Sequence, residues 1–140
     1  MTKAIDINNP GVKPLGRRVK MDSRATFAEL KMMVKAFCEE REWDQYNGPK
    51  DLVIGIVTEA GELLEKFRFK SESQVAEMLS DPGKRKEIGE ELADVLYFVV
   101  RFAQMNGFDL SDEFIKKMGV NQRKYPLKTS KGSNSKYNEH

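Results

Sequence analysis

The chain has one histidine, one cysteine and one tryptophan among its 140 residues, and the first two scarcities exclude whole classes of site. Its single histidine, His140, is the last residue, so the Glu-x-x-His motif that a di-iron carboxylate bundle needs on each of two helices is absent. A single cysteine, Cys38, cannot form an intrachain disulfide, which fits a reducing compartment. Because Cys38 lies in a helical pattern, we expect a buried, unreactive thiol.

Long apolar runs are also missing. No run of about 18 apolar residues exists, which excludes a membrane-spanning helix. The N-terminus has no apolar core of the kind that a secretory signal needs. The formal net charge is only +2, so overall charge does not point to a polyanionic partner. We therefore expect a soluble, cytoplasmic protein with no membrane partner.

Both ends of the chain differ from the middle. Residues 1–24 contain prolines and glycines and more basic than acidic residues, which predicts a basic N-terminal arm of the solubilising kind. Residues 127–140 are small and polar, which predicts a disordered tail. Residues 25–126 are long enough for one domain with its own core.

The middle of the chain shows four helical patterns and no alternating strand pattern. Thr26 followed by Glu29 predicts a capped start for the first helix, which runs to about residue 41. The second helix begins near Pro49, the third spans about 87–106, and the fourth spans about 111–124. A short extra helix is expected around 75–79. The sequence thus predicts an all-α protein of the four-helix bundle type. Six residues of the third helix should face inward: Ile88, Leu92, Val95, Leu96, Val99 and Val100.

Two pairs of carboxylates interrupt the apolar helices. Glu59 and Glu62 are three residues apart, as are Glu91 and Asp94, so each pair projects from one helix face. Such pairs often only decorate a solvated surface. Here each is embedded in a strongly apolar helix, and if these helices pack antiparallel the four carboxylates converge. Ligands that are all oxygen suit Mg²⁺ or Mn²⁺ rather than zinc.

Each acidic face continues into an aromatic residue, and other polar residues are spaced to join it. Phe69 follows Lys66 on the second helix, and Phe98 follows Asp94 on the third, so each ring could stack on a base or simply belong to the core. Trp43 and Asn47 lie in the preceding turn, as a plug over the bundle end or as a wall of a base pocket. A polar stripe on the fourth helix, either a solvated face or a contact for phosphate and sugar, consists of Lys117, Asn121 and Lys124.

Three segments in order carry a resemblance to a known family. "WDQYNGPKDLVIGIVTEAGELLEKFRF", "EELADVLYFV" and "KMGVNQRKYP" resemble the MazG-like all-α nucleoside triphosphate pyrophosphohydrolases, most of all their dCTP pyrophosphatase branch. The family's metal-binding signature is ExxE, a gap, then ExxD, and here 28 residues separate Glu62 from Glu91. The resemblance covers about residues 25–126.

The resemblance implies a site and a reaction. A nucleoside triphosphate would be cleaved between its α- and β-phosphates, giving a monophosphate and pyrophosphate. Mg²⁺ would be held by Glu59, Glu62, Glu91 and Asp94, and the general base would be one of them or a neighbour, Glu65 or Glu90. The resemblance places Trp43, Asn47, Phe69 and Phe98 around the base, and places Lys117, Asn121 and Lys124 against phosphates and sugar. It also implies a homo-oligomer, either a dimer or a tetramer built from dimers.

Three positions depart from the dCTP branch, which often has His, Trp and Tyr where this chain has Asn47, Phe69 and Phe98. These departures leave the four metal positions unchanged and concern the base alone. The expected substrate is dCTP or a modified cytosine analogue, with nucleotide pool sanitation as the role. Two alternatives stay open: the same chemistry on dUTP or another pyrophosphate, and a non-catalytic helical module that binds nucleotide. An acid-lined bundle makes nucleic acid an unexpected partner.

Overall fold

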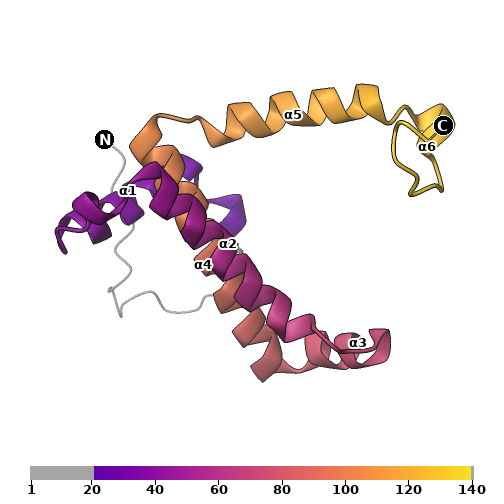
Figure 1. Cartoon of the computed structure of the whole chain (residues 1–140), viewed down its shortest axis with the longest axis horizontal. Coiled ribbons are helices and arrows are strands. Elements are labelled where there is room, and N and C mark those ends of the chain that lie inside the picture. Colours follow the sequence, from indigo (N-terminus) through magenta and orange to yellow (C-terminus); the bar gives the residue numbers. More distant parts are fainter. Residues whose placement is uncertain (1–20, 140) are drawn as a thin grey trace. The chain divides into compact units, whose positions relative to one another are not determined.

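The computed structural model describes residues 21–139 (Figure 1). Most of the predicted basic arm lies outside this range. The described chain forms two compact units, one up to Asn106 and one from Gly107 onward, and each is described by itself. Between residues 21 and 139 the regular structure is entirely helical, which confirms the all-α prediction.

The first unit begins with a short 3-10 helix, η1 (Met21–Ser23), followed by α1 (Phe27–Glu39). Thr26 Oγ1 accepts a hydrogen bond from the Glu29 amide at 3.2 Å, and Glu29 Oε2 accepts one from the Thr26 amide at 2.8 Å. This reciprocal pair satisfies two amides that the first helical turn leaves unpaired. The predicted capping box is confirmed.

A second 3-10 turn, η2 (Asp44–Tyr46), links α1 to α2 (Pro49–Phe67). Pro49 is the first residue of α2, where its fixed φ suits a helix and its missing N–H costs nothing. The predicted start of the second helix is confirmed.

The short helix predicted after α2 is present as α3 (Glu72–Ser80) and is longer than predicted. The next helix, α4 (Pro82–Asn106), starts at Pro82 rather than near Glu87. Asp81 precedes it, and Asp81 Oδ1 accepts a hydrogen bond from the Lys84 amide at 2.8 Å. An acidic N-cap followed by proline is itself a helix-start signal, whereas apolar spacing alone predicts the later start.

Helix α4 organises the first unit, because α2, α1 and α3 all pack against it. Figure 1 shows α2 and α4 side by side. They are antiparallel: Gly55, early in α2, faces Phe98 late in α4, whereas Lys66, late in α2, bonds to Glu91 earlier in α4. This register brings the two acidic motifs opposite each other.

The buried core of the first unit is small. Its apolar members are Cys38, Leu52, Met78, Ile88, Val100 and Ala103. The prediction that Leu92 and Leu96 face inward is wrong for the single chain, since these side chains are 54% and 41% exposed. Val57 on α2 is also 67% exposed. Helices α2 and α4 are apolar over more of their circumference than the neighbouring helices of one chain cover.

The second unit contains α5 (Leu110–Lys124) and a four-residue helix, α6 (Leu127–Ser130). Gly107 has a φ of 73°, a left-handed conformation that glycine adopts without strain and that ends α4. Asp109 caps α5 by accepting a hydrogen bond from the Asp112 amide at 2.9 Å. Helix α6 falls within the predicted tail. The packing of α5 in a four-helix bundle stays a prediction. No described helix is both long enough and apolar enough to cross a bilayer.

Candidate metal and nucleotide site

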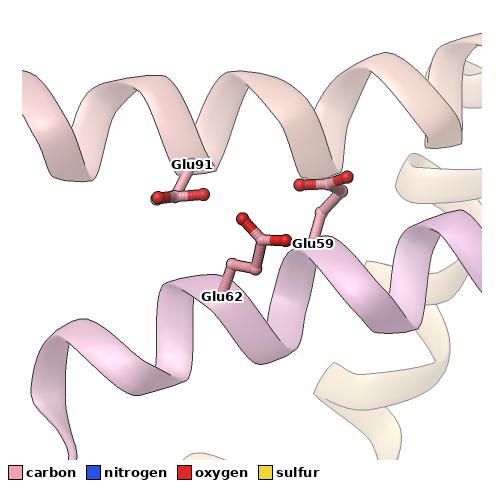
Figure 2. Close-up of side chains that lie close together, drawn as sticks. All are labelled: Glu59, Glu62 and Glu91. Atoms are coloured by element: carbon pink, nitrogen blue, oxygen red, sulfur yellow. The ribbon is translucent and has the colours of Figure 1, made fainter.

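Three predicted carboxylates meet between α2 and α4. Glu59 and Glu62 extend from α2 and Glu91 from α4, and all three point into the space between the two helices (Figure 2). One oxygen of each lies within 4.8 Å of the others. A group of carboxylate oxygens at this spacing suits a hard divalent cation such as Mg²⁺ or Mn²⁺.

Asp94, the fourth predicted ligand, does not belong to this group of three. Its side chain is exposed, and it lies one helical turn from Glu91 on α4. Its charge nevertheless acts on Glu59. Asp94 is therefore near the carboxylate group, and its role as a ligand stays a prediction.

Glu59 is the carboxylate of the group whose ionised form is disfavoured by its surroundings. Burial raises the pKa of the Glu59 carboxyl, and the charges of Glu62, Asp94 and Glu91 raise it further. Both effects penalise the ionised form, because the carboxyl is partly shielded from water and like charges are close. A divalent cation would offset this penalty. The three carboxylates therefore fit a divalent metal ion.

One cation of the chain already offsets part of the charge. Lys66 Nζ lies 3.0 Å from Glu91 Oε1, and both side chains are partly shielded from solvent. The hydrogen bond to Glu91 is the main cause of the raised pKa of Lys66. Helical spacing places Lys66 on the acidic face of α2, and the structure confirms that position.

The raised pKa of Glu59 predicts how stability depends on pH. A folded-state pKa above the unfolded value means that protonation of Glu59 favours the folded state, and this contribution is lost as the pH rises through the folded pKa. Without divalent cations, Glu59→Gln should match the wild type in melting temperature below about pH 4.5, exceed it as the pH rises through the folded pKa, and keep a constant advantage above that pKa. Thermal melts of both proteins in chelator across this range test the prediction, which parallel curves would contradict.

A cleft of about 510 Å³ opens beside the carboxylates among α2, α3 and α4. Lys66 and Glu87 lie on its wall, and so do two further cations, Lys70 and Lys84. The cleft thus combines ammonium groups with acids at the end of the site where α2 leads into α3.

Phe98 lies on the other side of the carboxylates, as its spacing predicts. A Cβ atom added at Gly55 would come within 2.4 Å of the Phe98 ring, so the absence of a side chain on α2 makes room for that ring. Tyr97, which helical geometry turns about 100° away from Phe98, packs edge-on against Phe98 with ring centroids 5.1 Å apart. Its hydroxyl is 3.1 Å from the buried Cys38 sulfur. Burial and this contact raise the pKa of Tyr97 to about 12.

Trp43 and Asn47 flank η2, next to this aromatic group. The Trp43 ring packs edge-on against Phe37, with centroids 5.5 Å apart, and Phe37 packs edge-on against Tyr97 at 6.2 Å. Asn47 is half-buried and accepts a hydrogen bond from Arg101. A chain of rings therefore connects the η2 turn to Phe98.

Phe69 does not continue the face of α2. The helix ends at Phe67, and Phe69 has a φ of 60° and is 91% exposed. Its ring contacts the Arg68 guanidinium, whose carbon is 4.6 Å from the ring centroid. The helical spacing used to place Phe69 is wrong, because the chain turns out of α2 two residues earlier. Its role at the base stays a prediction.

Lys117, Asn121 and Lys124 lie along α5 at the predicted helical spacing. They belong to the second unit, so their relation to the carboxylates stays a prediction. Within that unit, Lys124 Nζ lies over the Tyr137 ring, 4.9 Å from its centroid.

Arg101 on α4 is not among the site residues that the sequence predicts. It is 1% exposed, a position where an arginine is costly unless its donors are paired. The available signal was spacing: Glu91, Asp94, Phe98 and Arg101 recur at three- or four-residue intervals on one face of α4.

Comparison with known proteins agrees with this geometry. Residues 54–139 match the MazG-like family. The dCTP pyrophosphatase 1 of Mus musculus is 33% identical over 123 residues, which cover 88% of this chain and 72% of that protein. The dCTP pyrophosphatase 1 of Homo sapiens is 32% identical over 122 residues, covering 87% and 72%.

A solved structure gives the same answer. The crystal structure of a pyrophosphatase from Archaeoglobus fulgidus superposes with a TM-score of 0.66 and 33% sequence identity, covering 71% of this chain and 91% of that one. Sequence and fold therefore agree, and the facing acidic motifs of α2 and α4 lie within the matched residues. The chain belongs to the MazG-like family of nucleotide pyrophosphohydrolases.

Proposed function

We propose that this protein is a Mg²⁺-dependent pyrophosphohydrolase that converts dCTP, or a modified cytosine analogue, to the monophosphate and pyrophosphate. The observation that carries the proposal is the convergence of Glu59, Glu62 and Glu91 within 4.8 Å across two antiparallel helices. Sequence identity of 32–33% to dCTP pyrophosphatases over most of the chain supports the choice of nucleotide. Removal of such a nucleotide would serve sanitation of the nucleotide pool.

Each group in the cluster has a part in this reaction. Glu59, Glu62, Glu91 and Asp94 would hold Mg²⁺, with Mn²⁺ as an alternative. When bound, the cation supplies Lewis-acid polarisation of a phosphoryl oxygen and lowers the pKa of a bound water. One of these carboxylates, or else Glu65 or Glu90, would act as the base that accepts the proton of the attacking water. Lys66, released from Glu91, can move its charge toward phosphate oxygens.

The aromatic side of the site would receive the base. Trp43, Asn47 and Phe98 would surround it, with the rings stacking and Asn47 supplying hydrogen bonds. Phe69 is the fourth residue predicted at the base, although in this chain it lies past the opposite end of α2. The phosphates and the sugar would meet a separate polar set on α5: Lys117, Asn121 and Lys124. The cleft beside Lys66, about 510 Å³ in volume, offers room for a pyrophosphate group.

We also propose that the enzyme works as a homo-oligomer in the cytoplasm, as a dimer or as a tetramer of paired dimers. Support comes from apolar side chains that one chain leaves exposed on α2 and α4, among them Val57, Leu64 and Leu92. Surface of this kind is costly to leave in water, and a second copy can cover it. Light scattering during size-exclusion chromatography gives the number of chains.

A substrate panel tests the activity. The full chain is incubated with Mg²⁺ and each canonical dNTP, each NTP and several modified dCTPs, and pyrophosphate and orthophosphate are assayed separately. The expected products are pyrophosphate and dCMP, with turnover lost in chelator. Orthophosphate without pyrophosphate would place cleavage elsewhere, preference for dUTP would change the substrate, and Mg²⁺-dependent nucleotide binding without cleavage would leave a regulatory module.

A further inference from the structure

Arg101 is the buried charged residue among residues 21–139. Its guanidinium donors bond to residues of two elements, α4 and the turn around η2. Its Nη1 donates to Gln104 Oε1 on α4 at 2.5 Å. Its Nε donates to Asn47 Oδ1 at 2.9 Å, and its Nη2 forms an ion pair with Asp44. Asp44 is the first residue of η2 and Asn47 directly follows it, so a guanidinium on α4 holds the turn that Trp43 precedes.

Arginine chemistry fixes which way the Asn47 carboxamide faces. A guanidinium has only donors, so the atom that it contacts must be the carbonyl oxygen of Asn47. The amide nitrogen of Asn47 therefore lies on the other side of the carboxamide carbon. Among the described residues no acceptor bonds to this nitrogen. Within residues 21–139, Asn47 thus has two unused N–H donors and a carbonyl already engaged.

The distance along α4 between the carboxylates and Arg101 suggests which part of the substrate Asn47 could contact. Arg101 follows Glu91, Asp94 and Phe98 on one face of α4, seven residues after Asp94, or about 10 Å along the helix axis. That is the scale of a nucleoside between its α-phosphate and the outer edge of its base. The ring contacts lead from Trp43, which precedes the turn, to Phe98, four residues after Asp94 on α4.

We propose that Arg101 is a positioning residue that locks Asn47 as a hydrogen-bond donor, so that the enzyme recognises an acceptor on the base: a carbonyl oxygen or an unprotonated ring nitrogen. This inference rests on the proposed function and specifies its base pocket. Asn47 would then not bond to the exocyclic amine of cytosine, because that amine is also a donor. The acceptors on cytosine that match Asn47 are O2 and N3.

Asn47→Asp isolates the donor. The carboxylate still accepts from Arg101, as an ion pair, so the melting temperature should be equal or higher. The ligand, however, now meets an oxygen in place of an N–H. We expect the KM for dCTP to rise about tenfold or more, with a much smaller change in kcat, because a substrate acceptor loses its partner. Gln45→Glu makes the same chemical change in an exposed residue of the same turn and should leave KM within about twofold.

A double-mutant cycle tests the role of Arg101. In the wild type, Asn47→Ala should raise KM about tenfold. In an Arg101→Met background the carboxamide is no longer oriented, so the same substitution should change KM by less than about twofold. Arg101→Lys retains a donor for the Asn47 carbonyl and should recover part of the wild-type KM.

The inference and the proposed function fail separately. Binding of a non-hydrolysable α,β-imido dCTP, measured by calorimetry with Mg²⁺, does not require turnover. A tenfold loss of affinity in Asn47→Asp with no turnover by the wild type supports the inference and overturns the proposed function. Turnover with an unchanged KM in folded Asn47→Asp overturns the inference alone. Equal effects of Asn47→Asp and Gln45→Glu would also overturn it, since general charge repulsion would then explain both.

Discussion

Glu62→Gln is expected to lower kcat/KM for the preferred triphosphate by roughly 10²- to 10³-fold at a fixed Mg²⁺ concentration. Glutamine keeps the size of the side chain and removes the charge that would hold the cation. Loss of several kcal/mol of charge stabilisation in the transition state corresponds to a rate loss of this order. The measurement is initial pyrophosphate release against Mg²⁺ concentration, which should also show that the variant needs more Mg²⁺.

The apo fold should not suffer from this substitution. Glu62 raises the pKa of Glu59 by charge repulsion, so its removal relieves the cluster, and the melting temperature in chelator should be equal to that of the wild type or higher. Glu39→Gln is the matched control, because Glu39 is a surface acid paired with Lys35 at 2.9 Å, away from the cluster. Asp94→Asn tests the fourth ligand in the same assay. Wild-type kinetics in Glu62→Gln would refute the metal site.

Gly55→Ala is expected to destabilise the protein, although alanine is the better helix former. Its Cβ would lie 2.4 Å from the Phe98 ring, a distance that forces the ring or the helices to move. Overpacking costs about 1–3 kcal/mol, against a gain of about 0.5–1 kcal/mol from helix propensity. The steric cost wins, and displacement of Phe98 should also weaken nucleotide binding. Chemical denaturation and KM for the substrate measure the two effects.

Gly89→Ala is the control for this experiment. Gly89 is exposed on α4 and an added Cβ would meet nothing within 4 Å, so stability should rise by about 0.5–1 kcal/mol. Combining Gly55→Ala with Phe98→Leu should restore part of the lost stability, because the smaller side chain leaves space. Gly55→Ala as stable as Gly89→Ala would show that α2 and α4 are not packed as closely as described.

Local signals in the sequence determined most helix boundaries. Thr26 with Glu29 marks the start of α1, and Pro49 the start of α2, because caps and first-turn prolines act within a few residues of the chain. The same reasoning applied to Asp81 and Pro82 finds the true start of α4. Apolar spacing alone predicts a later start, near residue 87, because it does not include the cap.

The acidic cluster was also predictable, for a related reason. A three-residue spacing puts two carboxylates on one helix face whatever the tertiary structure, and an antiparallel pair of helices then brings two such faces together. Burial was less predictable. Leu92 has the spacing of a core residue but is 54% exposed, since exposure depends on which helices lie beside it.

The sequence by itself thus determined an all-α fold, the approximate positions of its four main helices, and the two carboxylate pairs that each share a helix face, because each follows from contacts within a turn or two of helix. The packing of α2 against α4 decided that Glu59, Glu62 and Glu91 meet and that Asp94 stays outside their group. Only the tertiary structure decided that Phe98 enters the space above Gly55 and that Arg101 orients Asn47. Phe98 and Gly55 are 43 positions apart in the chain, and Arg101 and Asn47 are 54 apart. Such contacts exist only once α4 has packed against the helices that precede it, and no spacing rule within one helix can specify them.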